Sequence, residues 1–198
     1  MFIWRVYKIL SKIAKLTPMV RLGNRTYRSW RTALNNGKIT YMTTSSKYRS
    51  HNRHKGRVSI PGAYYHIIIC THQRQKILAN NTAASIIFST FDWLETENRI
   101  EWICIMVMPD HVHTVIKLRE GQTLAKVLHS LKLFTARKIN KHLSRNGSLW
   151  QKGYTDWGIR TEATLNKTIH YCYTNPMRKG MVAASRDYPY WRCKFEME

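Results

Sequence analysis

Two hydrophobic periodicities alternate along the chain from residue 61 onward, and their order restricts the folds open to it. Tyr64 to Cys70, Trp102 to Met108 and His111 to Leu118 are rich in β-branched and other apolar residues, which is typical of strands. Thr82 to Asn98 and Leu124 to Phe134 repeat apolar residues at helical spacing. The sequence therefore predicts the order strand, helix, strand, strand, helix.

Turn and capping residues extend this order. Pro109-Asp110 separates the second and third strands, so these two strands should form a hairpin. A short strand is expected from Asp156 to Arg160, and Thr161 after it can cap a last helix. The order β-α-β-β-α-β followed by a helix predicts an α+β fold with an antiparallel sheet, a ferredoxin-like or RRM-like split βαβ core.

Positive charge is concentrated at the start of the chain. The 198 residues include 33 Lys and Arg against 11 Asp and Glu, a net charge of +22, and no acid precedes Asp92. The first 57 residues alone carry 14 Lys and Arg. We therefore expect a poorly ordered basic arm over residues 1–60, a packed domain over residues 61–190 and a tail over residues 191–198. This charge favours nucleic acids or anionic membrane surfaces as partners.

The arm is open to more than one interpretation. Met1 to Leu16 can form an amphipathic basic helix that lies on a membrane or on a nucleic acid, and Met42 is an alternative start of the protein. No run approaches the roughly 18 apolar residues of a membrane span, and lysines interrupt the opening segment where a signal peptide needs an apolar core. Neither stable membrane insertion nor secretion is expected.

His111 and His113 are the first candidates for chemistry. Side chains alternate along a strand, so both imidazoles should share one face while Val112 faces the core on the other. Two adjacent imidazoles can hold one divalent metal, although structural or surface histidines show the same pattern. The pair alone does not decide between these interpretations.

Tyr171 and Asn175 form a second candidate group on the last predicted helix. Their spacing of four residues places them on one helical face, and Pro176 should end or kink the helix at Asn175. If this face packs against the strand of the two histidines, the Asn175 oxygen completes a three-ligand site with Tyr171 beside the metal. Tyr173 points to another side of the helix and should pack in the core, and Tyr154 in a loop is the second candidate nucleophile.

Four motifs follow one another in order along the chain. They are Pro61 to His66, Met108 to His113, Leu149 to Tyr154 with Ile159-Arg160, and Tyr171 to Gly180. Together they resemble the single-tyrosine HUH transposases, and among these the REP-associated tyrosine transposases, whose hallmark is Tyr-x-x-x-Asn-Pro ahead of a basic residue and a glycine. The resemblance covers about residues 60–190. Thr114 departs from it, since a bulky aliphatic residue commonly follows the histidine pair.

The resemblance implies a transposase whose catalytic domain spans residues 61–190 and which cleaves and rejoins single-stranded DNA with the help of a metal ion. It carries over Tyr171 as the nucleophile and His111, His113 and Asn175 as the metal ligands. Family members act on palindromic repeats that form hairpins. The implied partner is therefore single-stranded hairpin DNA, bound by a monomer or homodimer in the bacterial cytoplasm.

The chemistry of these residue types agrees with the implied roles. A divalent metal at the scissile phosphate neutralises charge that develops during attack, an effect on the order of several kcal/mol. Attack by Tyr171 gives a 5′-phosphotyrosine and a free 3′-hydroxyl, which can be rejoined without ATP. A phenol keeps its proton at neutral pH, and the sequence offers no obvious general base. Two imidazoles and an amide suit Mg²⁺ or Mn²⁺ better than a structural zinc ion.

Basic and aromatic residues indicate the path of the DNA. Residues 119–152 hold eight Lys and Arg and one acid, and rings that include Trp157 follow, a mixture suited to unpaired bases. The same residues can also be a solvated face and a closed core. A non-catalytic RRM-like nucleic-acid-binding protein is the alternative function, and it predicts salt-sensitive binding without cleavage. The candidate DNA contacts are Arg74, Lys126, Lys132, Arg137, Lys141, Trp150, Lys152, Tyr154, Arg160 and Arg178.

Overall fold

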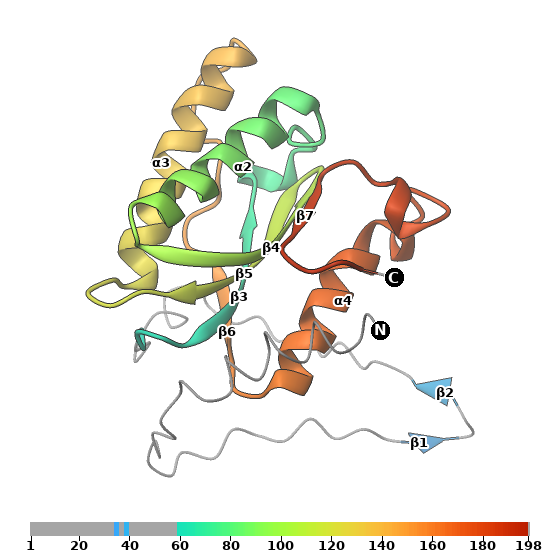
Figure 1. The fold of residues 1–198 in the computed structure, drawn as a ribbon. Helices are drawn as coiled ribbons and strands as arrows, with labels where there is room; N and C mark the ends of the chain where they lie inside the picture. Colours follow the sequence, from blue (N-terminus) through green and yellow to red (C-terminus); the bar gives the residue numbers. More distant parts are fainter. Residues whose placement is uncertain (1–33, 36–37, 40–58, 198) are drawn as a thin grey trace. The chain divides into compact units, whose positions relative to one another are not determined.

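The computed structural model describes residues 34–35, 38–39 and 59–197 (Figure 1). Most of the predicted basic arm, including Met1 to Leu16 and Met42, lies outside the described residues. Two short strands of the arm, β1 (Leu34–Asn35) and β2 (Lys38–Ile39), pair antiparallel in a unit of their own. Whether the arm is well ordered, and what it does, stay predictions.

Five strands within residues 59–197 form one antiparallel sheet. Their order across the sheet is β6-β3-β5-β4-β7, so β3 and β5 lie in the interior and β6 and β7 form the edges. β4 and β5 are joined by a turn at Pro109-Asp110, which confirms the predicted hairpin. The strands are β3 (Tyr64–Cys70), β4 (Ile100–Met108), β5 (His111–Leu118), β6 (Thr155–Ile159) and β7 (Trp191–Cys193).

Each of the three described α-helices begins after a side chain that caps it. Asn80, Thr123 and Thr161 each accept a hydrogen bond from the backbone N–H three residues later, which satisfies a donor that the helix itself leaves free. The predicted cap at Thr161 is confirmed. None of the described helices has the length and hydropathy needed to cross a bilayer. The helices are α2 (Asn81–Thr96), α3 (Leu124–His142) and α4 (Glu162–Arg178), with short 3-10 turns η2 (His72–Arg74) and η3 (Ser185–Asp187).

The sheet separates two hydrophobic cores, because side chains alternate between its faces. α2 and α3 lie on one face (Figure 1), where Ile67, Ile69 and Val112 point into the larger core. α4 lies on the opposite face, where Val115 of β5 and Cys172 of the helix belong to the second core. Alternation therefore decides which strand residues face α4.

An end of the last helix at Asn175 is ruled out, since α4 continues through Pro176 to Arg178. A proline in the last turn of a helix removes one backbone hydrogen bond, and the turn closes beyond it. The Lys179 N–H donates to the Asn175 carbonyl at 3.0 Å, and the Met181 N–H donates to the Pro176 carbonyl at 3.0 Å. Asn175 therefore lies in the last turn of the helix, before its last helical residue Arg178.

Two further elements differ from the sequence pattern. Phe134 is 46% exposed, with the Lys138 ammonium over its ring, and it does not belong to the buried face of α3. Thr135 and Ile139 take the next buried positions instead, since one residue turns a helix by about 100°. Trp191–Cys193 within the predicted tail pairs with β4 as edge strand β7, and a run of three residues shows no period from which to predict a strand.

Candidate active site

Three histidines share the sheet face that α4 covers. His66 lies on β3 and His113 on the neighbouring strand β5, where Ile68 pairs with His113. His66 and His111 are each 9% exposed and His113 is 2% exposed. Val112 points into the core of the other face. His111 and His113 thus share one face, as the alternation along a strand predicts.

The nitrogen atoms of these rings lie close together. His111 Nε2 is 3.0 Å from His113 Nε2, and His66 Nε2 is 3.1 Å from His113 Nδ1. The rings of His66 and His113 stack with their centroids 5.3 Å apart and their planes at 16°. His113 is therefore the central residue, with one ring nitrogen facing each neighbour.

α4 brings Tyr171 and Asn175 against the histidines on a single helical face. Asn175 Nδ2 lies 3.2 Å from His113 Nε2, and the residue is 4% exposed. The Tyr171 ring meets the His113 ring edge-on at 5.7 Å and the His66 ring at 6.2 Å between centroids. Because 39% of Tyr171 is still exposed, the residue touches both the histidines and the solvent, where a large substrate can reach it.

Burial keeps the three imidazoles neutral. It lowers the pKa of His66 to about 4 and holds the pKa of His113 well below its ordinary value, with His111 and His66 acting in the same direction on His113. Burial also lowers the pKa of His111, although the Asp110 carboxylate partly opposes this effect. Neutral imidazoles keep a lone pair that can bind a metal ion.

Asp110, in the turn between β4 and β5, orients His111, and Arg74 of η2 in turn contacts Asp110. Asp110 Oδ1 lies 2.5 Å from His111 Nδ1, and Arg74 Nη1 donates to Asp110 Oδ2 at 3.3 Å. Burial acts to raise the pKa of Asp110, but the hydrogen bond from His111 and the charges beside it outweigh burial and lower the pKa. When Nδ1 carries the hydrogen, Nε2 presents its lone pair to His113. For Asp110 the sequence pattern predicts only a turn, and it gives no sign of the contact with His111. For Arg74 the sequence predicts a DNA contact, and in the structure its guanidinium donates to Asp110.

The donor atoms around His113 Nε2 fit a small divalent cation. His111 Nε2 lies 3.0 Å and the side-chain amide of Asn175 lies 3.2 Å from this atom. Adjacent ligands of one octahedral ion have about this separation when each lies about 2.1 Å from the ion. Asn175 Oδ1 has no hydrogen-bond partner among the described residues. Turning the amide by half a rotation exchanges Nδ2 for Oδ1 and directs the oxygen to the histidines. A cation bound at this point would give the buried oxygen the partner that it lacks among the described residues.

His113 Nδ1 faces a second set of potential ligands. Cys172 Sγ lies 3.7 Å from His66 Nε2, and the ligand atoms of His66, His113 and Cys172 lie within 4.8 Å of one another. Cys172 is fully buried, and a thiolate selects zinc or another soft metal rather than Mg²⁺ or Mn²⁺. The two candidate metal sets are on opposite sides of the His113 ring and share that residue.

Not all of the predicted DNA contacts are exposed. Trp150 is 5% exposed, and its Nε1 donates to Thr135 Oγ1 at 2.9 Å, so its indole belongs to the core. The ammonium of Lys132 donates to the carbonyls of Gln151 and Gly153 at 2.5 and 2.8 Å and thereby holds the loop before β6. The sequence alone does not show that Trp150 and Lys132 are engaged inside the protein and not free on its surface.

The remaining candidates differ in their distance from the histidines. Tyr154 is half-buried against the core of α2 and α3, so the structure does not bring this second candidate nucleophile to the cluster. α3 packs on the opposite face of the sheet from α4, the helix that carries Tyr171. The Arg178 guanidinium, in contrast, lies 4.8 Å from the centroid of the Tyr171 ring. Besides Arg74, the exposed candidates are Lys126, Arg137, Lys141, Lys152, Arg160 and Arg178.

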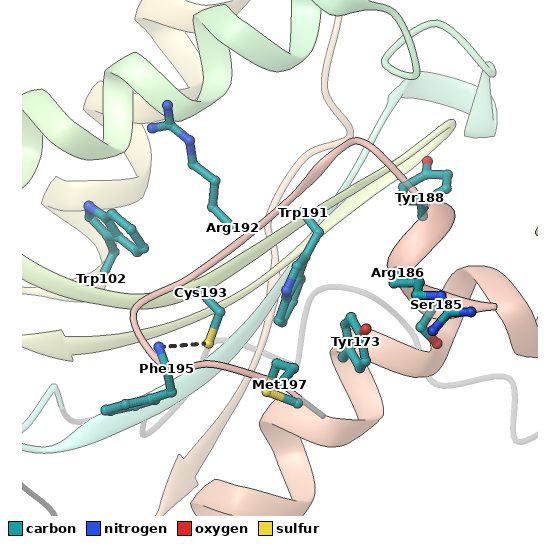
Figure 2. A pocket seen from close by; sticks show the side chains of 10 residues that line it. All are labelled: Trp102, Tyr173, Ser185, Arg186, Tyr188, Trp191, Arg192, Cys193, Phe195 and Met197. Carbon is teal, nitrogen blue, oxygen red and sulfur yellow. Dashed lines mark hydrogen bonds between the residues drawn. The ribbon is translucent and has the colours of Figure 1, made fainter. Parts of the chain in front are cut away.

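A hollow of about 630 Å³ lies on another side of α4 (Figure 2). Tyr173 and Trp191 line it with their ring centroids 5.5 Å apart. Arg192 points away from these rings in Figure 2, and its guanidinium lies 2.9 Å from the Asp92 carboxylate. Because Tyr171 and Tyr173 occupy different sides of the helix, this hollow is separate from the histidine cluster.

Comparisons with known proteins identify relatives of this chain. A family model described as "Transposase IS200 like" matches residues 59–174, a range that includes the three histidines and Tyr171 and stops one residue before Asn175. A REP-associated tyrosine transposase of Haemophilus influenzae is 28% identical over 100 residues, which cover 46% of this chain and 57% of the relative. The chain thus spans just over half the length of that protein.

Two further similarities cover more of the related chains. The ISDra2 transposase TnpA of Deinococcus radiodurans is 29% identical over 123 residues, which cover 58% of this chain and 87% of the relative. A solved structure of a REP-associated tyrosine transposase bound to a REP hairpin matches with a TM-score of 0.57 and 20% identity. That match covers 74% of this chain and 81% of the other, and at this identity it shows a similar fold.

Proposed function

The chain belongs to the IS200-like transposase family, and from this membership we propose that it cleaves and rejoins single-stranded DNA through a covalent bond to Tyr171. One observation carries the proposal. The Tyr171 ring is half in solvent and edge-on to His113, at the point where His111, His113 and Asn175 converge. This arrangement supports Tyr171 as the nucleophile beside a set of metal ligands, with access for a polymer.

The connectivity of the core supports this assignment. The order β6-β3-β5-β4, with α2 and α3 as the connections between strands, corresponds to a ferredoxin-like split βαβ core. The two connecting helices cover one face of the sheet and leave the other to α4. The interior strands can therefore present histidines to a tyrosine on α4 without disturbing the larger core.

Tyr171 is the proposed nucleophile. Its Oη attacks the scissile phosphorus while the bond from phosphorus to the 3′ oxygen breaks, which leaves a 5′-phosphotyrosine and a 3′-hydroxyl. The phenol loses one proton and the leaving oxygen gains one, so the step consumes no water. One phosphodiester replaces another, and attack by a 3′-hydroxyl rejoins the strand without ATP. Arg178 over the tyrosine ring offers its positive charge to the phosphate.

His111, His113 and Asn175 are the proposed ligands of Mg²⁺ or Mn²⁺. The support is the 3.0 and 3.2 Å separation of the donor groups and the buried Asn175 oxygen that has no partner among the described residues. When bound, the ion supplies charge neutralisation at the scissile phosphate. Asp110 is proposed as a positioning residue, since it holds His111 with Nε2 directed to the same point.

Single-stranded DNA that folds into hairpins is the proposed substrate. The related solved structure is bound to a REP hairpin, and residues 58–198 of this chain keep a net charge of +8 without the basic arm. Lys152, Arg160 and Arg178 are exposed on the loop before β6, at its end and on α4, and we propose that they contact phosphates. Both named relatives are bacterial, and we propose the bacterial cytoplasm as the place of the reaction.

Covalent capture tests this function. Purified protein is incubated with single-stranded hairpin DNA and Mn²⁺, and the products are separated under denaturing conditions. We expect a protein–DNA adduct that is lost in EDTA and lost in the Tyr171→Phe variant. Tyr173→Phe is the matched control, because it removes a hydroxyl from the same helix on a different side, and it should form the adduct normally. An adduct that persists in Tyr171→Phe would assign the nucleophile to another residue and overturn the proposal.

A further inference from the structure

A hollow of about 330 Å³ lies beside Tyr171, between α4 and the strands β6 and β3. Its volume is at the lower end of the range for small-ligand sites, so it suits a single nucleotide rather than a longer stretch of DNA. The strands contribute Trp157, His66 and Ile68, and the helix contributes Thr164, Lys167, Thr168 and Tyr171.

Trp157 forms an exposed aromatic wall of this hollow. The residue is 47% exposed although it carries the largest apolar side chain, and its indole stacks on the His66 ring with centroids 5.2 Å apart and planes at 25°. His66 stacks in turn on His113, so three rings form a continuous stack from the surface to the candidate metal ligands. The stack holds the indole in place and leaves its other face to a ligand.

Lys167 provides a cation next to this wall. It lies four residues before Tyr171, one helical turn away on the same face of α4. It is exposed, and it forms no ion pair with any residue in the described part of the chain. A rigid exposed ring beside a solvated cation is the combination with which proteins bind unpaired nucleotides, because every base offers a flat face and every nucleotide a phosphate.

We propose that this hollow binds one of the two nucleotides that flank the scissile phosphate, with its base stacked on Trp157 and its phosphate next to Lys167. The proposal rests on the proposed function and adds a base-stacking subsite to it. A base held here lies within one nucleotide of the reacting phosphate, so stacking would fix the position of that phosphate against Tyr171. Because stacking does not read base identity, the subsite would accept purines and pyrimidines alike.

A double-mutant cycle between protein and DNA tests the subsite. The adduct-forming rate at subsaturating DNA is measured for intact oligonucleotides and for oligonucleotides with an abasic site at each flanking position. We expect an abasic site at one of the two positions to lower the rate about 10- to 100-fold with the wild-type protein. Trp157→Ala should cause the same loss on intact DNA and no further loss on the abasic DNA, whereas Trp157→Phe should retain most of the rate.

Trp93→Ala is the matched control, because Trp93 is also 47% exposed but lies on α2, on the other side of the sheet. It should leave the rate unchanged. If Trp157→Ala lowers the rates on intact and abasic DNA by the same factor, the indole acts only through His66, and the subsite proposal is wrong. The proposal also fails if Trp157→Ala behaves like Trp93→Ala.

A binding measurement separates this proposal from the proposed function. The Tyr171→Phe variant, which keeps the hollow, is titrated with DNA that carries the fluorescent base 2-aminopurine at either flanking position. Stacking on Trp157 should quench the fluorescence at one position, and the additional Trp157→Ala change should abolish the quenching. Quenching without any adduct from the wild-type protein would support the subsite and reject the cleavage activity. An adduct without position-specific quenching would do the reverse.

Discussion

The side-chain oxygen of Asn175 lies buried beside the histidines and has no hydrogen-bond partner among the described residues. A buried polar group without a partner lowers stability by about 1–3 kcal/mol. Evolution of a stable core alone would favour an apolar residue of the same size at this place. If the amide binds the proposed metal ion, stability and activity should respond to its removal in opposite directions.

Asn175→Leu tests this expectation. In EDTA, we expect the free energy of unfolding of the variant to be at least that of the wild type, because the buried oxygen is replaced by an apolar group of similar volume. Added Mn²⁺ should raise the Tm of the wild-type protein, by linkage of binding to folding, and should not raise the Tm of the variant. Denaturant and thermal unfolding measure both effects. Equal stabilisation of the two proteins by Mn²⁺ would remove Asn175 from the ligand set.

The Asp110 carboxylate should act on the metal through His111. Asp110→Asn replaces a charged acceptor at 2.5 Å by a neutral amide, so the imidazole becomes a weaker and less oriented ligand. We expect the Mn²⁺ concentration for half-maximal adduct formation to rise roughly 10- to 100-fold, with the rate at saturating Mn²⁺ less affected. Asp92→Asn, which alters an exposed pair with Arg192, is the matched control and should leave this concentration unchanged. An unchanged metal requirement in Asp110→Asn would contradict the positioning role.

Local periodicity accounts for the residues of the site that the sequence predicts. His111 and His113 share a face because a strand alternates, and Tyr171 and Asn175 share a face because a helix has 3.6 residues per turn. His66 was not predicted, since its contact with His113 depends on the register between β3 and β5, and no local pattern contains that register. Asp110 could have been identified locally, because its carboxylate directly precedes the histidine pair. From the sequence pattern it was assigned only to a turn.

At the scale of elements, the boundaries of β3 and β5 agree with the sequence because turn or polar residues adjoin these apolar runs. The exceptions are β7 and the end of α4. β7 is a strand because it pairs with β4, which lies far from it along the chain. α4 passes Pro176 because the carbonyls of Asn175 and Pro176 still accept hydrogen bonds from the residues just beyond the proline. A distant pairing thus decided β7, and hydrogen bonds across the last turn decided the end of α4.

Lys132 connects two elements and is expected to act on stability rather than on DNA. Its ammonium is half-buried and holds the loop before β6 to α3 through two carbonyls, and burial lowers the pKa of this group. Lys132→Met should lower the free energy of unfolding by about 1–3 kcal/mol, because both carbonyls lose their donor. Arg137→Met at an exposed position of α3 is the control and should change the free energy of unfolding by less than about 0.5 kcal/mol. A reduced salt dependence of DNA binding in Lys132→Met, with unchanged stability, would restore the predicted DNA contact.

At the scale of the whole molecule, the sheet assigns different tasks to its two faces. The face of α2 and α3 carries the larger core, and the face of α4 carries the histidines and Tyr171. The proposed chemistry therefore uses the face with the smaller core, where buried polar groups displace fewer apolar contacts. Positive charge and proposed chemistry also lie in different parts of the chain. The first 57 residues hold 14 of the 33 basic residues and none of the residues proposed to react.

A protein that starts at Met42 tests what this charge contributes. The change removes nine Lys and Arg and lowers the net charge from +22 to +13. Each phosphate contact to single-stranded DNA contributes about 0.7 to the slope of log K against log salt, so affinity should fall and the slope should become shallower. The rate of adduct formation at saturating DNA should not change, because every residue proposed to react lies between His111 and Arg178. Binding titrations at several salt concentrations and adduct rates at saturation measure the two effects. A lower rate at saturation would show that the arm takes part in the reaction and would contradict the division of tasks.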